Sequence, residues 1–320
     1  MKYLISVIAL LCLLVTTDAH AKTIYVSLEG KNSFRGTREK PRKDLQQAIN
    51  CLSPGDTLVI LSGTYLFETP LFVNIKGTKN EPIVIKGFTD EIPVFDGTGF
   101  IKDPDNHEYP SKRGLGLIHM EAARHIVLKN IKVVNSRNIG IQVRKSTNII
   151  ISNCVTNRTY GSGIALWYSD SCEVHHCEIT RANDPSFRAP GQPEPREAPH
   201  EGLTVAGATN FNVHDNVIHN CYKEGIDVKE VSAKGIVHNN YIYDMPRQGL
   251  YVDSWFGLLH DVEFYSNTVH DCEWGMAISA EGKDSEMQNI QIHHNVFYNN
   301  RGSGILFGVW GHDRLRKNLK

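Results

Sequence analysis

Three acidic side chains and one lysine lie at alternate positions of short apolar segments of this chain, the second, fourth or sixth residue after a glycine. Asp227 and Lys229 lie in GIDVK, Asp253 in GLYVD and Glu281 in GMAISAE. Polar and aliphatic residues alternate there with the two-residue period of a strand that buries one face. If these strands lie side by side, Asp227 to Asp253 and Asp253 to Glu281 are both diagonals of roughly 8 Å. Two carboxyl groups about 5 to 9.5 Å apart are the machinery of glycoside hydrolysis.

Asp253 and Glu281 form the preferred catalytic pair, with Asp227 and Lys229 as further candidates. Lys229 stands at the position equivalent to Asp253 on the preceding strand, where an ion pair would hold Asp253 ionised. Such a reaction requires no cofactor, and flat aromatic faces would contact the sugar rings. The candidate substrate-binding residues are Trp167, Tyr168, Tyr251, Trp255 and Trp274.

Two alternatives use the same region differently. Glu201 in HEGL, with Glu224 and Asp227 in KEGID, would offer the hard oxygen ligands that Ca²⁺ prefers, which suits calcium-assisted elimination from an acidic polysaccharide. Lys229 would serve as the base only if its pKa were depressed. The third class is a non-catalytic carbohydrate-binding or adhesin solenoid, which would spread aromatic residues along its face without clustering carboxylates.

A repeat of glycines predicts the elements that must position these residues. A glycine followed by an aliphatic residue begins a short strand at intervals of 23 to 39 residues, and asparagines keep step with it. Two strand signals in each repeat of about 24 residues indicate stacked coils, so the expected fold is an all-β right-handed parallel β-helix. The glycines are Gly116, Gly140, Gly163, Gly202, Gly225, Gly249, Gly275 and Gly304, and the asparagines are Asn130, Asn153, Asn216, Asn240, Asn267 and Asn295.

Each marker has a physical reason. The first and third residues after the glycine are apolar and should fill the core, whereas the second and fourth should face outward. Glycine suits a strand entry where a side chain would be crowded. Stacked asparagines can bond side chain to side chain along the coils. Cys154 and Cys177 share one register, so we expect stacked buried thiols, with a disulfide as the alternative.

The beginning of the chain indicates its compartment. Lys2, an apolar run and Ala19-His20-Ala21 are typical of a cleaved secretory signal peptide over residues 1–21, which predicts a periplasmic or extracellular protein. No later stretch is long and apolar enough to span a membrane. The 34 basic and 35 acidic residues give a net charge of −1, which makes nucleic acid an unsuitable partner. A poly- or oligosaccharide is the expected partner, and the protein is expected to be a monomer.

The repeat also divides the chain. Residues 22–100 should form a cap and the first coils, with a short amphipathic capping helix between Asp44 and Leu52, and residues 101–320 should form regular coils. The proline-rich stretch 183–200 should protrude as a loop beside the site. The chain stops at 314–320, where another strand is due, which suggests truncation at the C-terminus.

The entry segment resembles that of the pectin-lyase-like superfamily, with a YVS strand, a helix containing Ala-Ile, and the PGDT and GTY turns. This resemblance implies the right-handed β-helix fold. GLYVDSW is similar to a segment of family 120 glycoside hydrolases, which implies that Asp253 is the nucleophile and Glu281 the acid/base. HEGL and KEGID resemble the calcium-binding turns of family 9 polysaccharide lyases, although Tyr251 stands where that family has its lysine base.

Overall fold

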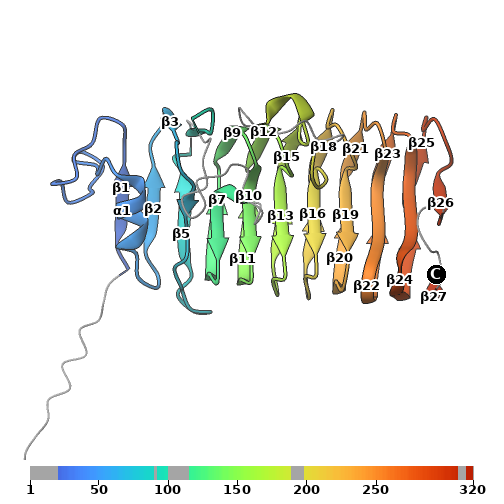
Figure 1. Cartoon of the computed structure of the whole chain (residues 1–320). Helices are drawn as coiled ribbons and strands as arrows, with labels where there is room; N and C mark the ends of the chain where they lie inside the picture. Colours follow the sequence, from blue (N-terminus) through green and yellow to red (C-terminus); the bar gives the residue numbers. More distant parts are fainter. Residues whose placement is uncertain (1–20, 90–91, 100–114, 189–197, 309–314, 320) are drawn as a thin grey trace, which may run out of the picture.

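The chain folds as a parallel β-helix, as the glycine repeat predicts. The computed structural model describes residues 21–89, 92–99, 115–188, 198–308 and 315–319. Every strand pair in these residues is parallel, and successive coils stack along one axis (Figure 1). The expected signal peptide lies almost wholly outside the described residues, as do residues 189–197 of the 183–200 loop. No helix in the described residues is long and apolar enough to cross a membrane.

Each coil contributes strands to three faces. The first, here called the site face, contains the strands that follow the repeat glycines. Its register pairs Asp227 with Tyr251 and Lys229 with Asp253, as expected. The site face consists of β4 (Leu71–Phe72), β7 (Gly116–Glu121), β10 (Ile139–Arg144), β13 (Ile164–Trp167), β16 (Leu203–Ala206), β19 (Ile226–Lys229), the first halves of β22 (Gln248–Tyr265) and β24 (Trp274–His293), and β26 (Ile305–Phe307).

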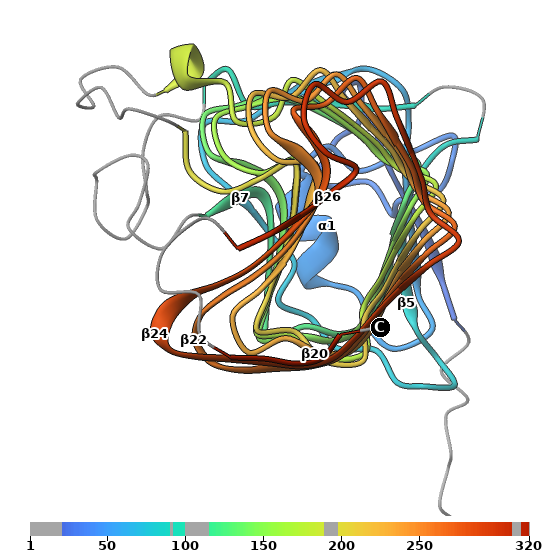
Figure 2. The same cartoon turned by 90° about the vertical axis from the view of Figure 1, so that its right-hand side faces the viewer.

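The other two faces complete the coil. The second face joins the site face through β22 and β24, which run around the corner between them; this corner projects outward in Figure 2. The second face contains β1 (Thr23–Val26), β2 (Thr57–Ile60), β5 (Ile83–Gly87), β8 (Arg124–Lys129), β11 (Thr147–Ser152), β14 (Glu173–His175), β17 (Asn212–His214), β20 (Ala233–His238) and β27 (Leu315–Leu319). The third contains β3 (Thr64–Leu66), β6 (Val94–Asp96), β9 (Lys132–Ser136), β12 (Val155–Thr159), β15 (Glu178–Thr180), β18 (Val217–His219), β21 (Tyr241–Tyr243), β23 (Thr268–His270) and β25 (Val296–Tyr298).

The interior is filled as the alternation predicts. Ile226, Val228, Leu250 and Val252, at the first and third positions after their glycines, are all fully buried in the core cluster. The repeat glycines stack into a column. A Cβ at one of them would collide with the carbonyl oxygen of the glycine on the next coil, as at Gly225. Close approach of backbones, and not a positive φ, therefore requires glycine there.

The asparagine ladder is real but starts later than the sequence pattern suggests. Asn216 donates to Asn240, Asn240 to Asn267 and Asn267 to Asn295, each through Nδ2 to Oδ1 at 2.9 Å. On earlier coils the strand register places Cys177 and Cys154 in this column. The alignment of Asn130 and Asn153 with the ladder was therefore wrong by one residue. Both occupy the preceding corner, with φ of 58° and 51°, a conformation that asparagine tolerates.

The two cysteines in this column are thiols. Cys154 and Cys177 are both buried and carry no disulfide, which agrees with the stacked-thiol expectation. Cys177 receives the end of the ladder, because its backbone N–H donates to Asn216 Oδ1 at 3.0 Å. The hydrogen-bonded asparagine ladder therefore ends at Cys177, and the buried cysteines continue the same column.

The ends of the solenoid are closed differently. Helix α1 (Leu45–Asn50) lies across the N-terminal coils and buries Leu45, Ala48 and Ile49, as the amphipathic pattern predicts (Figures 1 and 2). Asp44 caps it by accepting from the backbone N–H of Gln47. At the other end the expectation of a missing strand was wrong, because β27 pairs with the second half of β24.

We expect the asparagine ladder to contribute strongly to stability. Asn240 is 1% exposed, and its replacement by Ala leaves both the amide and the backbone N–H of Asn216 without their acceptor. Asn240→Ala should lower the free energy of unfolding by about 2 to 3 kcal/mol, measured by chemical denaturation. Exposed Asn80 supplies the control, since its Ala variant should change that energy by less than about 0.5 kcal/mol. Equal effects of the two substitutions would contradict a stabilising ladder.

Candidate active site

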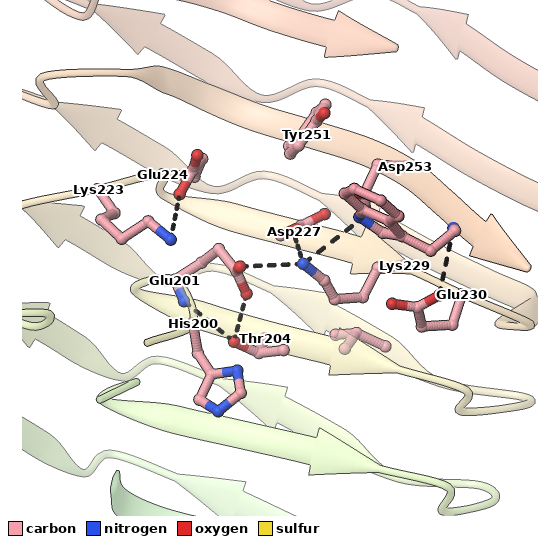
Figure 3. Close-up of polar contacts among 12 residues, drawn as sticks. His200, Glu201, Thr204, Lys223, Glu224, Asp227, Lys229, Glu230, Tyr251 and Asp253 are labelled. Atoms are coloured by element: carbon pink, nitrogen blue, oxygen red, sulfur yellow. Dashed lines mark hydrogen bonds and ion pairs between the residues drawn. The ribbon is translucent and has the colours of Figure 1, made fainter. Parts of the chain in front are cut away.

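The centre of the site is the ammonium group of Lys229, which three carboxyl groups surround. Lys229 Nζ lies 2.8 Å from Asp227 Oδ2, 3.0 Å from Glu201 Oε1 and 3.8 Å from Asp253 Oδ1 (Figure 3). The stacking of β16, β19 and β22 brings these residues together, although they span more than fifty positions of the sequence. All three acids are at most 4% exposed, so the outward positions of this face are covered and not bathed in solvent.

Glu201 is held in place by a hydroxyl group of its own coil, which a second hydroxyl group on the preceding coil supports. Thr204 Oγ1 donates to Glu201 Oε2 at 2.7 Å, and Ser162 shares a 2.7 Å hydrogen bond with Thr204. Together with Lys229 on Oε1, these contacts occupy both oxygens of Glu201. Glu201 is therefore a fixed countercharge for the lysine.

Burial and charge set the protonation of this cluster. Burial raises the pKa of Glu201, but the positive charges of Lys229, His200 and Lys223 and the hydrogen bond from Thr204 together outweigh burial and hold the pKa at about 2. Burial also lowers the pKa of Lys229, yet its carboxylate neighbours raise it well above its ordinary value. Burial and the charge of Asp253 raise the pKa of Asp227 well above its usual range. One buried cation cannot keep three carboxylates ionised.

Asp253 is protonated at neutral pH. Burial, with the carboxylates of Glu201 and Glu281, raises its pKa to about 8 against the opposing charge of Lys229. The expectation that Lys229 holds Asp253 ionised is thus not supported, since the ammonium lies closer to Asp227 and Glu201. A protonated carboxyl suits a proton donor better than a nucleophile.

Glu281 is positioned by Tyr251 and by an irregularity in the strands. The Tyr251 hydroxyl donates a hydrogen bond to Glu281 Oε1. The register between β22 and β24 shifts after Ser254, so Glu281, Gly282 and Lys283 bulge from β24 opposite the single residue Trp255. A Cβ at Gly282 would overlap the Trp255 carbonyl oxygen, so only glycine permits this approach. Glu281 stays half-buried, in contact with solvent, while Asp253 is buried.

These groups share the wall of one cavity of about 560 Å³. A larger cavity of about 700 Å³ lies beside α1, but Asp44 is the one carboxylate on its wall, so it lacks a pair. Chemistry therefore favours the smaller cavity. Its wall is formed by Glu201, Lys223, Glu224, Lys229, Pro246, Arg247, Gln248, Tyr251, Asp253, Trp255, Glu273, Trp274 and Glu281.

The carboxylates expected to bind calcium form ion pairs with lysine and arginine side chains. Glu224 accepts a hydrogen bond from Arg247 Nη1 at 2.7 Å and lies 3.8 Å from Lys223, while Glu201 and Asp227 contact Lys229. Among the residues that the structure describes, no three His, Cys, Asp or Glu side chains are arranged to hold a metal ion. Side-chain cations fill the positions that the sequence analysis assigned to Ca²⁺.

The aromatic candidates divide into two groups. Tyr251, Trp255 and Trp274 line the cavity, and Tyr251, which is 6% exposed, donates a hydrogen bond to Glu281. The structure places Trp167 and Tyr168 outside this wall: Trp167 packs edge-on against His200, and Tyr168 covers Gly207. Trp167 is the last residue of β13 and Tyr168 follows it, so both lie two strands away from β19.

Sequence reasoning missed part of the wall. Arg247, Gln248, Glu273 and Lys223 occupy the two positions that precede each repeat glycine, as Glu201 and Glu224 do. The strand register was applied only to residues that follow the glycines. If the two residues before each glycine are placed in the same columns, the sequence predicts that these side chains lie beside the site.

The fold and much of the sequence match known proteins. The sequence pattern of the Pel9A-like right-handed β-helix region matches residues 24–193, more than half of the chain. This chain belongs to the Pel9A-like right-handed β-helix family. A general right-handed β-helix pattern also matches residues 115–289 and 197–318, which covers the coils of the site. The right hand of the solenoid, expected from the sequence, agrees with both patterns.

Individual relatives differ in what is known of them. The uncharacterized protein YwoF of Bacillus subtilis is 29% identical over 92% of this chain and 65% of its own length. Pectate lyase PEL9 of Emericella nidulans is 24% identical over 48% of this chain and 38% of its own length. This chain therefore spans less than two thirds of either relative. Endo-xylogalacturonan hydrolase from Aspergillus tubingensis shares the fold, with a TM-score of 0.64, 10% identity, and 84% and 73% of the two chains covered.

We expect the protonated Asp253 to make stability fall as pH rises. Its folded pKa of about 8 lies above the ordinary value of 3.8, so the unfolded chain releases this proton first and the free energy of unfolding falls towards pH 8. Asp253→Asn should therefore unfold at a higher temperature than the parent at pH 8, but not near pH 4, in thermal scans. Exposed Asp261, whose pKa its hydrogen bond from Asn289 lowers, is the control: Asp261→Asn should give no such gain. A lower melting temperature of Asp253→Asn at pH 8 would contradict burial of a neutral acid.

Proposed function

We propose that this protein hydrolyses glycosidic bonds, with Asp253 as the proton donor and Glu281 as the partner carboxylate. The observation that carries this proposal is the unequal environment of two acids on one cavity wall. Burial keeps Asp253 protonated, whereas Glu281 contacts solvent and accepts a hydrogen bond from Tyr251. Two carboxyl groups in unequal environments, one buried and one in contact with solvent, are an arrangement that suits the acid and the partner carboxylate of glycoside hydrolysis.

In this reaction each residue has one task. Asp253 gives its proton to the glycosidic oxygen as the bond to the anomeric carbon breaks, and water supplies the hydroxyl group of the new reducing end. Glu281 stabilises the developing positive charge, either by bonding to the anomeric carbon or by accepting a proton from the water. Lys229 and Glu201 form a fixed ion pair beside Asp253. This order of roles is the reverse of that implied by the family 120 resemblance.

A second carboxyl group, that of Glu201, also lies close to Asp253. Because Lys229 Nζ contacts both groups, Glu201 Oε1 and Asp253 Oδ1 are separated by at most the sum of the two distances, 6.8 Å. Glu201 is nevertheless a poorer partner than Glu281, since Thr204 and Lys229 occupy its oxygens and it is 4% exposed.

Calcium-assisted elimination is the second candidate, favoured by the similarity to pectate lyase PEL9. Its requirements fit this site less well. Lys229 is held protonated by its carboxylate neighbours, and burial raises the pKa of Tyr251, so neither is suited to abstract a proton at neutral pH. The carboxylates of the expected calcium site already bind lysine and arginine.

The signal-like segment 1–21 agrees with a role outside the cytoplasm, which we propose together with glycoside hydrolysis.

Substitution of either acid should remove the activity. On a panel of glycans, Asp253→Asn and Glu281→Gln should each lower kcat by about 10²- to 10⁴-fold, measured as new reducing ends. Glu263→Gln, on the second face beside His293, should keep the parent rate. Unsaturated uronate products that require Ca²⁺ and persist in Asp253→Asn would instead establish the lyase. Glycan binding without any cleavage would favour the non-catalytic solenoid.

The activity should also fall on the alkaline side. Because the pKa of Asp253 is about 8, kcat should decline by about tenfold per pH unit above that value as the proton donor ionises. Initial rates between pH 5 and 10 in constant ionic strength measure this limb. A rate that stays level or rises above pH 9 would rule out Asp253 as the donor.

A further inference from the structure

The corner between the site face and the second face lengthens from coil to coil. Between the same two points of the strand register, the chain advances by four residues from 229 to 233, by seven from 253 to 260 and by nine from 279 to 288. The corners of β22 and β24 therefore project beyond that of β20 (Figure 2). Trp255 and Glu281 lie in the lengthened stretches, so the added residues build part of the cavity wall. Insertions in a solenoid often form its binding surface.

The insertion in β22 is held to the preceding coil by Glu230. Glu230 Oε2 accepts a hydrogen bond from the backbone N–H of Trp255 at 3.3 Å, a contact that Figure 3 draws beside Lys229. The described strand pairs give Trp255 no partner on β19 or β20, so this side chain supplies the acceptor that a neighbouring strand would normally provide. Within the insertion, the buried hydroxyl of Ser254 donates to the carbonyl oxygen of Phe256 at 3.1 Å.

The bulge in β24 is held by Ser285. Ser285 Oγ donates to the carbonyl oxygen of Gly282 at 2.7 Å, and this serine is 1% exposed. On its other side, Gly282 lies against the carbonyl oxygen of Trp255. Removal of a buried hydroxyl leaves its acceptor without a donor, which is unfavourable. The backbone of the bulge, residues 281–283, is therefore fixed from both strands.

Fixing this backbone also fixes Glu281. Its side chain leaves the first residue of the bulge and meets the hydroxyl of Tyr251 on the cavity wall. Glu230 and Ser285 are not among the described residues of that wall. A reacting carboxyl group must be held within about 0.5 Å of its working position, and a projecting corner does not supply that rigidity by itself.

We propose that Glu230 and Ser285 are positioning residues, which hold the corner of β22 and β24 so that Glu281 faces the cavity. Both act through backbone groups, Glu230 through Trp255 and Ser285 through Gly282. This inference rests on the proposed function for the task of Glu281, and it goes further by naming the residues that set its geometry.

A pair of serine variants tests the role of Ser285. Ser136 is the matched control, because it is also buried and its Oγ donates to a carbonyl oxygen three residues away, that of Ile139, at 2.8 Å. On a glycan that the parent cleaves, Ser285→Ala should lower kcat about tenfold or more and leave KM within about twofold, since the wall that binds the sugar is unchanged. Ser136→Ala should keep the parent kcat. Equal values of kcat for the two variants, or a raised KM with an unchanged kcat, would overturn the role of Ser285.

A pair of variants at Glu230 tests the second contact independently. Glu230→Gln keeps an acceptor oxygen for the Trp255 N–H and should retain kcat at pH 6, whereas Glu230→Leu removes the acceptor and should lower kcat about tenfold. Thermal melting establishes which variants fold. Loss of activity in both folded variants, or in neither, would overturn the role of Glu230. If Glu230→Leu does not fold, the serine pair decides, and if Ser285→Ala does not fold, the Glu230 pair decides.

Hydrogen–deuterium exchange separates this inference from the proposed function, because it requires no substrate. In Ser285→Ala the backbone amides of residues 281–285 should exchange about tenfold faster than in the parent, and in Ser136→Ala they should not. Unchanged exchange in this segment would overturn the inference even if the parent hydrolyses glycans. A parent that cleaves no glycan would overturn the proposed function, while faster exchange confined to the bulge would still support the positioning of Glu281.

Discussion

The parallel register between successive coils is the constraint on which the rest of this structure depends. Backbone hydrogen bonds fix each residue beside its counterpart on the next coil, about 4.8 Å away. A side chain therefore belongs to a column as much as to a strand. The glycine column permits the backbones to approach at one corner, and the ladder from Asn216 to Asn295 joins them at another. A slip of one residue would move every core side chain to the outside.

The register also creates the electrostatic problem that defines the site. Columns on the outer side of the site face bring Glu201, Asp227 and Asp253 around one ammonium group, beneath side chains that exclude solvent. The cluster keeps one firm ion pair, between Lys229 and Glu201, and leaves protonated acids beside it. Burying such a group costs stability, which is typical of sites that are maintained for function. The same lysine contacts Glu201 and Asp227, two of the residues considered as calcium ligands.

The membership of this chain in a β-helix family narrows the chemistry without deciding it. Relatives and structural neighbours include both a lyase and a hydrolase, because the solenoid supplies a rigid column of strands on which either site can be built. The difference lies in a few side chains per coil. In this chain the lysine is protonated and the buried aspartic acid carries a proton, and those two states favour protonation of a leaving group over abstraction of a proton.

The repeat in the sequence was sufficient to predict the β-helix and the pairing of Lys229 with Asp253, and the helical spacing of apolar residues between Asp44 and Leu52 predicted the capping helix. These features could be predicted because strand period, coil length and helical period are local properties of the chain. The repeat misplaced Asn130 and Asn153 by one residue, because asparagine suits both a stacked ladder and a left-handed corner. Only the tertiary structure decided which outward residues are buried, that Trp167 and Tyr168 lie apart from the cavity, and that Arg247 and Gln248 belong to it. It also decided the protonation of Asp253, for a physical reason: a pKa depends on solvent exclusion and on the distances to all neighbouring charges. Those distances are set by the packing of several coils together.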